Sequence, residues 1–212
     1  MKAKTKPVIG IIGAGRLGTA VATAALKAKY QVNIANSRDP ETLTLILQVL
    51  LPGAHADTVS NVILLSDIIV LAIPRTKFKN FSSNLFDNKI VIDAMNYWQT
   101  TEGYVEELAN GKVSTSEDIQ KKLAKAYIVK TLNHIAYNEL IEHSLPAGSP
   151  NRRAIALAGD HSEAKKRVAT FINDIGFDPV DLGNLSEGKY FQPDNPLFNT
   201  RYSAEELQKM NK

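Results

Sequence analysis

The chain has 212 residues, of which 44% are hydrophobic and 22% charged, and its formal net charge at pH 7 is +3. This length and composition predict one large globular α/β domain with at most a small appendage, and they exclude a disordered or fibrous chain. Cysteine is absent, which excludes disulfides, zinc–thiolate sites and thiol catalysis and is compatible with a cytoplasmic location. Basic residues are scattered along predicted helices, so we expect no nucleic-acid partner.

No segment of the sequence is suited to a membrane. The longest apolar stretch, residues 62–73, is interrupted by Ser66 and Asp67 and is too short to cross a bilayer. The basic N-terminus is followed by a glycine-rich motif in place of a small-residue cleavage site, so we do not expect a signal peptide. The sequence predicts a soluble protein without a membrane partner.

Residues 8–18 read VIGIIGAGRLG, a short apolar strand that runs into a GxGxxG motif and then into an Ala-rich helix over 19–29. Gly13 permits a sharp turn, Gly15 leaves room for a pyrophosphate, and Gly18 lets the helix pack close to the strand. The free amides and the positive dipole end of the helix favour an anion. The motif predicts a dinucleotide site, and a glycine turn without a ligand is the alternative.

The second strand, over 31–35, ends in Asn36, Ser37 and Arg38. NAD-binding proteins place an acidic residue here to bind the ribose 2′-hydroxyl, and this strand end has none. Asn36 and Ser37 can donate hydrogen bonds, and Arg38 can form a fork on a phosphate, which predicts NADP(H). In the alternative, Asp39 binds the ribose, although Asp39 followed by Pro40 is also a typical helix start.

The pattern next predicts a helix over 41–51, a strand over 55–58, a helix over 59–65 and a strand over 68–74. The first helix is apolar nearly all round, so we expect its leucines in the core. The strand over 68–74 is a continuous apolar run of the kind that is buried on both faces of a parallel sheet. Because ligands bind at the carboxyl ends of such strands, Ala72, Ile73 and Pro74 are predicted to lie at the site.

Further along, we predict a helix over 77–86, a strand over 90–94, a short helix over 105–109 within a loop over 100–112, a helix over 116–126 and a strand over 127–132. The strand over 90–94 ends in Asp93, Ala94, Met95 and Asn96. Asp93 is either a catalytic acid or, as we favour, an acceptor for backbone amides of the loop. A capping box is predicted to begin at Ser116.

Two familiar catalytic pairs do not fit. Lys130 and Asn133 have the spacing of the pair in β-hydroxyacid dehydrogenases, but on a strand these positions point to opposite faces. Tyr127 and Lys130 lack the Tyr-x-x-x-Lys spacing of short-chain dehydrogenases. No metal-binding cluster is expected among the four histidines.

The last quarter predicts a strand over 153–158, a helix over 162–175, a strand over 179–182 and a polar helix over 203–210. Asp178 and Asp181 are interpreted as turn residues. The whole pattern predicts a Rossmann-type, doubly wound, mostly parallel α/β sheet. We assign residues 1–135 to a dinucleotide-binding domain and residues 136–212 to a small C-terminal αβ extension that completes the substrate pocket, and we expect a homodimer.

Seven segments in this order carry a family resemblance: GIIGAGRLG, NSR, VLAIP, VIDAMNYW, VKTLNHI, RRAIALAGD and IGFDPVDLGNLSEGKYFQPDNPLF. Over nearly its full length the chain resembles the NADPH-dependent F420 reductases (F420H2:NADP oxidoreductases) and the related cytoplasmic oxidoreductase domains of STEAP metalloreductases. The resemblance implies a Rossmann fold with a C-terminal extension, NADP(H) as hydride donor or acceptor, and a deazaflavin (F420) or flavin (FMN or FAD) ring beside the nicotinamide.

The resemblance also implies site residues. The dinucleotide contacts that it implies are Ala14, Gly15, Arg16, Leu17, Ser37, Arg38 and Ile73. More loosely, it implies a nicotinamide and ring pocket built from Met95, Asn133, His134, Ile135 and residues 196–198. With the residues that the pattern places at strand ends, the predicted cofactor set also includes Gly13, Asn36, Ala72, Pro74, Ala94 and Asn96.

We expect no obligatory catalytic acid or base, because hydride transfer between a nicotinamide and a deazaflavin needs no side-chain proton. His134, with Asn133, is therefore interpreted as orienting the ring. The alternatives are a non-catalytic NADP(H)-binding redox sensor and an NADPH-dependent reductase of another small substrate.

Overall fold

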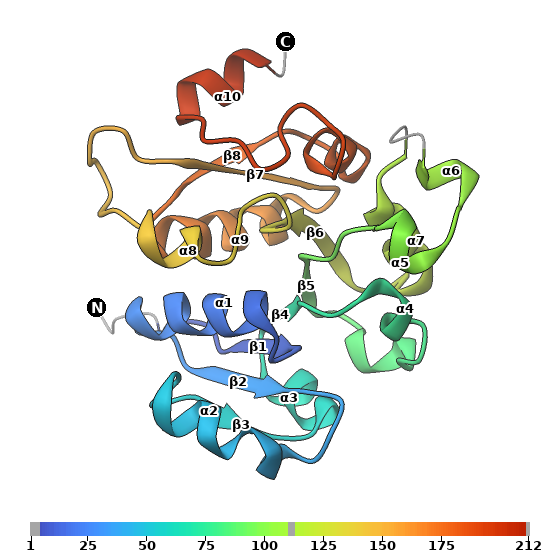
Figure 1. Cartoon of the computed structure of the whole chain (residues 1–212), viewed down its shortest axis with the longest axis vertical. Helices are drawn as coiled ribbons and strands as arrows, with labels where there is room; N and C mark the ends of the chain where they lie inside the picture. The colour runs from blue at the N-terminus through green and yellow to red at the C-terminus, as the bar shows by residue number, and fades with distance from the viewer. Residues whose placement is uncertain (1–4, 110–112, 211–212) are drawn as a thin grey trace.

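In a computed structural model, which describes residues 5–109 and 113–210, the chain forms one sheet flanked by helices (Figure 1). The strands are β1 (Ile9–Ile12), β2 (Val32–Ala35), β3 (His55–Ala56), β4 (Ile68–Leu71), β5 (Ile90–Asp93), β6 (Tyr127–Thr131), β7 (Ala154–Gly159) and β8 (Asp178–Asp181). The α-helices are α1 (Arg16–Lys27), α2 (Thr44–Val49), α3 (Val59–Leu65), α4 (Arg75–Phe78), α5 (Gln99–Glu102), α6 (Glu106–Ala109), α7 (Thr115–Lys122), α8 (Glu139–Glu142), α9 (Ser162–Asp174) and α10 (Ala204–Met210). Short 3₁₀ helices are η1 (Pro40–Leu43), η2 (Ser83–Phe86) and η3 (Leu185–Phe191).

The strand order is β3-β2-β1-β4-β5-β6-β7-β8, and every neighbouring pair is parallel except β6 and β7. After β1 the chain turns to β2 and β3 on one side, then crosses back to β4 on the other. This reversal is the switch point at which doubly wound sheets bind ligands. The predicted Rossmann-type fold is confirmed. The C-terminal strands β7 and β8 continue the same sheet, and the domain boundary at residue 135 stays a prediction.

The register of the sheet brings five strand ends to one edge. Ile12 is aligned with Ala35 of β2 and with Leu71 of β4. Leu71 is aligned in turn with Asp93, which is aligned with Lys130. The segments that follow β1, β2, β4, β5 and β6 therefore lie at this carboxyl edge of the sheet.

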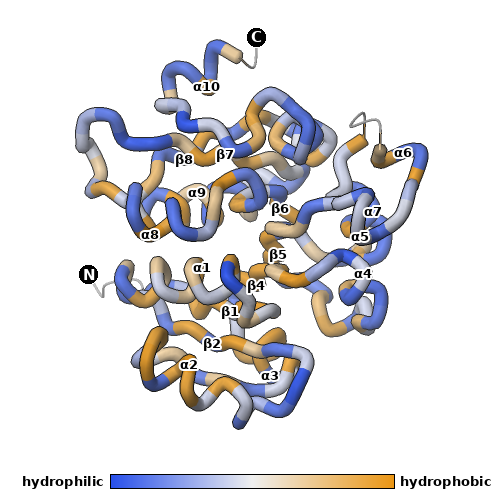
Figure 2. The backbone as a smooth tube through the Cα atoms, viewed as in Figure 1, coloured by the Kyte–Doolittle hydropathy of each residue, from blue (hydrophilic) through white to orange (hydrophobic). Residues whose placement is uncertain are grey.

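Alternate side chains of the central strands enter the two hydrophobic clusters that cover the faces of the sheet. Ile11 and Val70 belong to one cluster, and Ile12 and Leu71 belong to the other. Strands that are buried on both faces are apolar at most positions, as the orange colour of β4 in Figure 2 shows. A third cluster covers β7 and β8 and includes Leu207 of α10, which explains how this polar helix is held.

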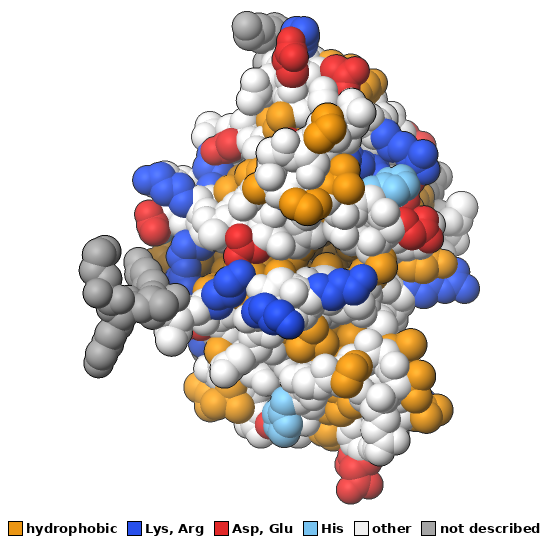
Figure 3. All heavy atoms as spheres, turned by 90° about the vertical axis from the view of Figure 1, so that its left-hand side faces the viewer, with side chains coloured by type: hydrophobic (Ala, Val, Ile, Leu, Met, Phe, Trp, Pro, Cys, Tyr) orange, Lys and Arg blue, Asp and Glu red, His pale blue; other side chains and the backbone are white. Residues whose placement is uncertain are grey.

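The prediction that the leucines of 41–51 are core was wrong for the middle of that segment. The chain forms η1 and then α2 there, and Leu45 and Leu50 are 71% and 54% exposed. The two-residue strand β3 forms the edge of the sheet beside α2, so there is little sheet surface for a second apolar face to cover. Hydrophobic side chains accordingly lie at the surface of the lower end in Figure 3.

Three local predictions also differ from the structure. The helix predicted over 77–86 consists of α4 and η2, separated by a break where Phe81 packs against Phe78 and Phe86. The capping box lies at Ser114 and Glu117, two residues before the predicted start. Helices α5 and α8 were missed, and residues 110–112 of the predicted 100–112 loop lie outside the described residues. Short elements of this kind carry too few residues for a periodic signal.

Asp178 and Asp181, predicted as turn residues, instead begin and end β8. The carboxylate of Asp181 still accepts a hydrogen bond from the Gly183 amide at 2.9 Å, so it shapes the turn that follows the strand. Asp178 has a different partner, because its carboxylate forms an ion pair with Arg152.

The close packing of α1 on β1 gives a stability prediction. A Cβ on Gly18 would lie 1.8 Å from the Gly13 carbonyl oxygen, whereas a Cβ on Gly15 would meet nothing within 4 Å. Gly18→Ala should therefore lower the free energy of unfolding by about 1–3 kcal/mol. Gly15→Ser, which adds a good N-cap residue in open space, should change it by less than about 0.5 kcal/mol. Urea unfolding of both variants measures the difference, and equal effects would contradict the packing described here.

Candidate dinucleotide-binding site

The turn between β1 and α1 is built by its three glycines in different ways. Gly13 has a φ of +115°, and a Cβ there would lie 2.2 Å from the Ala72 carbonyl oxygen of the segment after β4. Gly18 has no room for a Cβ against the turn itself, whereas Gly15 faces open space. Two glycines are therefore required by packing and one leaves a space, which is the arrangement that a pyrophosphate needs.

The N-terminus of α1 is suited to an anion. Gly15 is its N-cap, no side chain caps it, and its first turn contains no acidic residue. Arg16, the first residue of the helix, is exposed. Amide groups, the helix dipole and a cationic side chain thus meet at the open position beside Gly15. The residues present fit a dinucleotide pyrophosphate.

At the end of β2, Ser37 and Arg38 are exposed. Asn36 is used inside the turn, because its Oδ1 accepts from the Arg38 amide at 2.8 Å and its Nδ2 donates to Thr42 at 3.0 Å. Asp39 caps η1 by accepting from the Glu41 amide at 2.9 Å. Asn36 therefore shapes the loop that presents Ser37 and Arg38, and the carboxylate of Asp39 has a structural partner.

The other predicted contacts differ in exposure. Of the residues after β4, Ala72 and Ile73 are half-buried and Pro74 is exposed, so the edge above β4 is accessible. After β5, Ala94 and Met95 are buried and Asn96 is half-buried. Ile135, after β6, is 6% exposed. The structure thus brings all these segments to one edge, but Ala94, Met95 and Ile135 form its base and not its open surface.

A buried ion pair lies beneath that base. Lys130 of β6 and Asp93 of β5 are 0% and 1% exposed, and the Lys130 Nζ lies 3.4 Å from Asp93 Oδ2. The ammonium also donates to the Met95 carbonyl oxygen, while Asp93 accepts from the Met95 amide at 3.0 Å and from the Ser116 hydroxyl at 2.5 Å. Burial lowers the pKa of Lys130, and the Asp93 carboxylate opposes that effect. The pair fixes both peptide groups of Met95, and the prediction that Asp93 orders its loop is confirmed.

Two asparagines join the loops after β5 and β6. Asn96 Nδ2 donates to the Asn133 carbonyl oxygen at 2.8 Å, and Asn133 Nδ2 donates to Asn96 Oδ1 at 3.0 Å. Asn133 Nδ2 also donates to the Phe191 carbonyl oxygen at 2.8 Å. This exchange fixes the distance between the two loops and links them to η3.

His134 is 4% exposed, and both of its ring nitrogens have partners within the protein. Its Nε2 accepts from the Ala156 amide at 3.1 Å, its Nδ1 lies 3.4 Å from Asn133 Oδ1, and its ring packs on Phe191. Burial, with the charges of Arg153 and Lys130, lowers the pKa of His134 to about 3. His134 is thus a neutral side chain that holds the loop after β6 against β7, and its predicted role toward a ring stays a prediction.

The segment over 196–199 closes the far side of this region. Leu197 is buried in the cluster around β7, and the Asn199 amide donates to the His134 carbonyl oxygen at 3.0 Å. Phe198 contacts Trp98 edge to face, with ring centroids 6.0 Å apart. A cavity of about 150 Å³ opens beside this contact and is lined by Tyr97, Trp98, Gln99, Leu108, Ala109, Thr115, Gln192, Pro193, Asp194 and Asn195.

Sequence reasoning missed most of that cavity. Thr115 and Gln192 meet there because the Thr115 amide donates to Gln192 Oε1 at 2.6 Å, across 77 positions of sequence. The available signal was Tyr97 and Trp98, two aromatic residues directly after the polar end of a buried strand.

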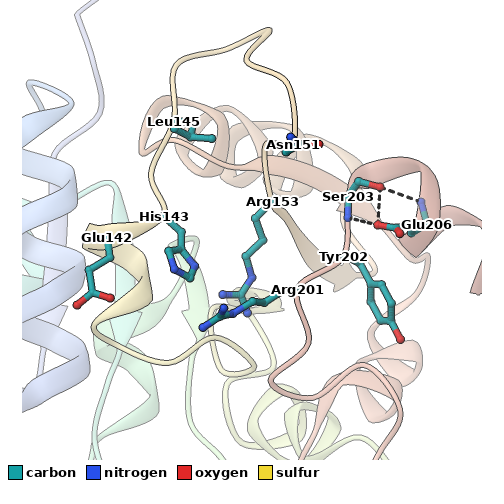
Figure 4. A pocket seen from close by; sticks show the side chains of 9 residues that line it. All are labelled: Glu142, His143, Leu145, Asn151, Arg153, Arg201, Tyr202, Ser203 and Glu206. Atoms are coloured by element: carbon teal, nitrogen blue, oxygen red, sulfur yellow. Dashed lines mark hydrogen bonds between the residues drawn. The ribbon is translucent and has the colours of Figure 1, made fainter.

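A larger cavity of about 420 Å³ lies elsewhere, beside α8 and α10 (Figure 4). Arg153 and Arg201 lie side by side there, and both donate to the carboxylate of Glu139. Burial raises the pKa of Glu139, but the hydrogen bonds from the two arginines outweigh it, so this pKa is lower than usual. None of the predicted site residues lines this cavity.

Two absences apply to the described part of the chain. Over residues 5–109 and 113–210, no group of three or more His, Asp or Glu side chains is placed to hold a metal ion. Within the same ranges, no helix has both the length and the apolar character that a membrane span requires.

The low pKa of His134 predicts a pH dependence of stability. In the unfolded chain, His134 becomes protonated below its ordinary pKa of 6.5, whereas in the folded protein it stays neutral down to about pH 3. The free energy of unfolding therefore falls as the pH falls through this window. The slope is about 1.4 kcal/mol per pH unit. Between pH 7 and 4.5, the free energy of unfolding of His134→Gln should therefore fall by about 2–3 kcal/mol less than that of the unaltered protein, as measured by urea unfolding. His55→Gln, at an exposed position, is the control, and an unchanged slope in His134→Gln would contradict the assignment.

Comparison with known proteins finds similarity to one family of oxidoreductases. Residues 8–97 match the family model described as NADP oxidoreductase, coenzyme F420-dependent. The metalloreductase STEAP3 of Rattus norvegicus is 25% identical over 189 residues, which cover 88% of this chain and 36% of that protein. The chain spans less than half of the length of the curated relatives that it matches.

Two solved structures share the fold over most of both chains. The hypothetical protein SMa0349 of Sinorhizobium meliloti has a TM-score of 0.80 and 28% identity, covering 94% of this chain and 96% of that one. A candidate F420-dependent NADP-reductase of Arthrobacter sp. FB24 has a TM-score of 0.71 and 23% identity, covering 86% and 87%. These matches confirm the resemblance identified in the sequence, and the match to the coenzyme F420-dependent NADP oxidoreductase family model covers residues 8–97.

Proposed function

We propose that the protein is an NADP(H)-dependent oxidoreductase that exchanges hydride with a deazaflavin (F420) or flavin (FMN or FAD) ring. The observation that carries the proposal is the exposed pair Ser37 and Arg38 at the end of β2, beside the uncapped N-terminus of α1. A guanidinium and a hydroxyl suit a ribose 2′-phosphate, and the carboxylate that would select NAD, that of Asp39, is used as a helix cap.

When bound, NADP(H) supplies or accepts the hydride at its nicotinamide ring. The residues of this chain bind and orient the two partners and exclude water. Gly15, Arg16 and the amides of α1 would hold the pyrophosphate. The joined loops that carry Asn96 and Asn133 would support the nicotinamide, because hydrogen bonds fix them to each other and to η3.

The chemistry of this edge favours a partner that needs no proton from a side chain. Lys130 is fully buried and paired with Asp93, and His134 is neutral with both nitrogens engaged. Reduction of a carbonyl or imine would require a proton donor at the reacting atoms, whereas hydride exchange with a flavin-like ring would not. The exposed aromatic ring of Trp98 offers a surface for a planar partner. A homodimer and a cytoplasmic location stay predictions.

Cofactor choice gives one test of the proposal. Arg38→Ala removes a charged partner of the 2′-phosphate and should weaken NADPH binding by about ten- to a hundredfold. Binding of NADH, which lacks that phosphate, should be unchanged. Arg167→Ala, at an exposed position on α9, is the control and should alter neither affinity. Equal loss of NADPH and NADH binding in Arg38→Ala, or no loss of either, would overturn the assignment of Arg38.

The reaction itself is tested by absorbance at 340 nm, with NADPH and a panel of F420, FMN, FAD and riboflavin. We expect turnover with at least one of these rings. His134→Ala, Asp93→Asn and Lys130→Met should each slow the single-turnover hydride step by less than about a hundredfold, the lower range of a general acid or base. A greater loss with both partners bound would indicate a proton-transfer residue and a carbonyl or imine substrate. Binding of NADPH without turnover of any ring would favour a redox sensor.

A further inference from the structure

The side chain of Arg16 lies over the ring of Tyr137, with the guanidinium carbon 5.6 Å from the ring centroid. Arg16 begins α1 directly after Gly15, and Tyr137 belongs to the segment between β6 and α8. This distance is within the range of a cation–π contact, in which the guanidinium is attracted to the negative face of the ring. The contact joins two segments that are far apart in the sequence at the mouth of the candidate site.

The electrostatic setting of Arg16 is unusual. The N-terminus of a helix carries partial positive charge and normally favours acidic side chains, yet α1 has a cation at its first position and no acid in its first turn. A cation here is unfavourable unless an anion lies nearby. A phosphate at the open position beside Gly15 would meet both the helix dipole and the guanidinium, so the unfavourable charge would become a favourable one.

The backbone on both sides of Tyr137 is anchored to the rest of the protein, although the Tyr137 ring is 42% exposed. On one side, His134 is tied to the Ala156 amide and to the Asn199 amide, and Ile135 is buried. On the other side, the carboxylate of Glu139 accepts hydrogen bonds from Arg153 at 2.7 Å and from Arg201. The backbone that carries the ring is therefore anchored on both sides, whereas an exposed arginine is by itself free to rotate.

We propose that Tyr137 is a positioning residue, which holds the Arg16 guanidinium ready for a phosphate of the dinucleotide pyrophosphate. This inference rests on the proposed function. A guanidinium that is already held in place loses less rotational freedom on binding, which raises affinity without a new contact to the ligand. Because the pyrophosphate is common to both dinucleotides, the effect applies equally to NADPH and NADH.

A double-mutant cycle, with dissociation constants for NADPH and NADH from isothermal titration calorimetry, tests the proposal. Arg16→Ala should weaken both ligands by about tenfold or more. Tyr137→Leu should weaken both by about two- to fivefold, and Tyr137→Phe, which keeps the ring, should bind as the unaltered protein does. In the Arg16→Ala background, Tyr137→Leu should have no further effect.

The matched control is Tyr104→Leu, which removes a ring that is 64% exposed in the segment between α5 and α6. It should leave both affinities unchanged, and circular dichroism checks that every variant is folded. The inference is overturned if Tyr137→Leu weakens binding equally with and without Arg16, if Tyr137→Phe behaves like Tyr137→Leu, or if Arg16→Ala binds normally. Failure of the unaltered protein to bind either dinucleotide would instead overturn the proposed function, and this inference with it.

Discussion

The close approach of the β1–α1 turn to its neighbours is the constraint on which the site depends. The positions where a Cβ would stand on Gly13 and Gly18 are already taken by the carbonyl oxygens of Ala72 and Gly13, at 2.2 and 1.8 Å. Strand β1 can therefore end beside the end of β4, and α1 can begin three residues after Gly13. Because the sheet register fixes β2 and β4 on either side of β1, the N-terminus of α1 points to the edge where the other strands end. A candidate anion site follows from this packing before any side chain is considered.

A second constraint acts at β5 and β6. Removing the Lys130 ammonium and the Asp93 carboxylate from water is costly, and their attraction is useful only while every remaining hydrogen-bonding group is satisfied. Met95 supplies an acceptor to one and a donor to the other, and Ser116 of α7 completes the carboxylate. The segment after β5 is therefore fixed by charge more than by apolar packing. We regard the pair as a device that specifies the position of this loop rather than one that adds net stability.

The features that could be predicted from the sequence are those with a local cause. The glycine motif, the apolar strands and the helix start at Asp39 each depend on neighbours within one turn or one strand, and the structure has all three. The exposure of the side chains in the middle of 41–51 could not be predicted from the apolar pattern of that segment. It depends on the length of the neighbouring strand β3, which has only two residues. The Lys130–Asp93 pair was missed for a related reason. A lysine within an apolar strand requires a buried acid, but its identity depends on which strands are adjacent.

The two ends of the site are consequently built in different ways. The end that would bind a pyrophosphate is formed almost wholly by one continuous segment, residues 8–18. The end that would receive the second ring is assembled from distant segments, as the contacts between Asn133 and Phe191 and between Thr115 and Gln192 show. Such contacts form only when the C-terminal strands have joined the sheet. A substitution in the segment after β8 should therefore first disturb the loops that would receive the ring partner. It would affect the end that would bind the pyrophosphate only through the segment that carries Tyr137. A Rossmann sheet with the same glycine motif could in this way retain dinucleotide binding, while the sequence of its C-terminal third determines which second ligand it binds.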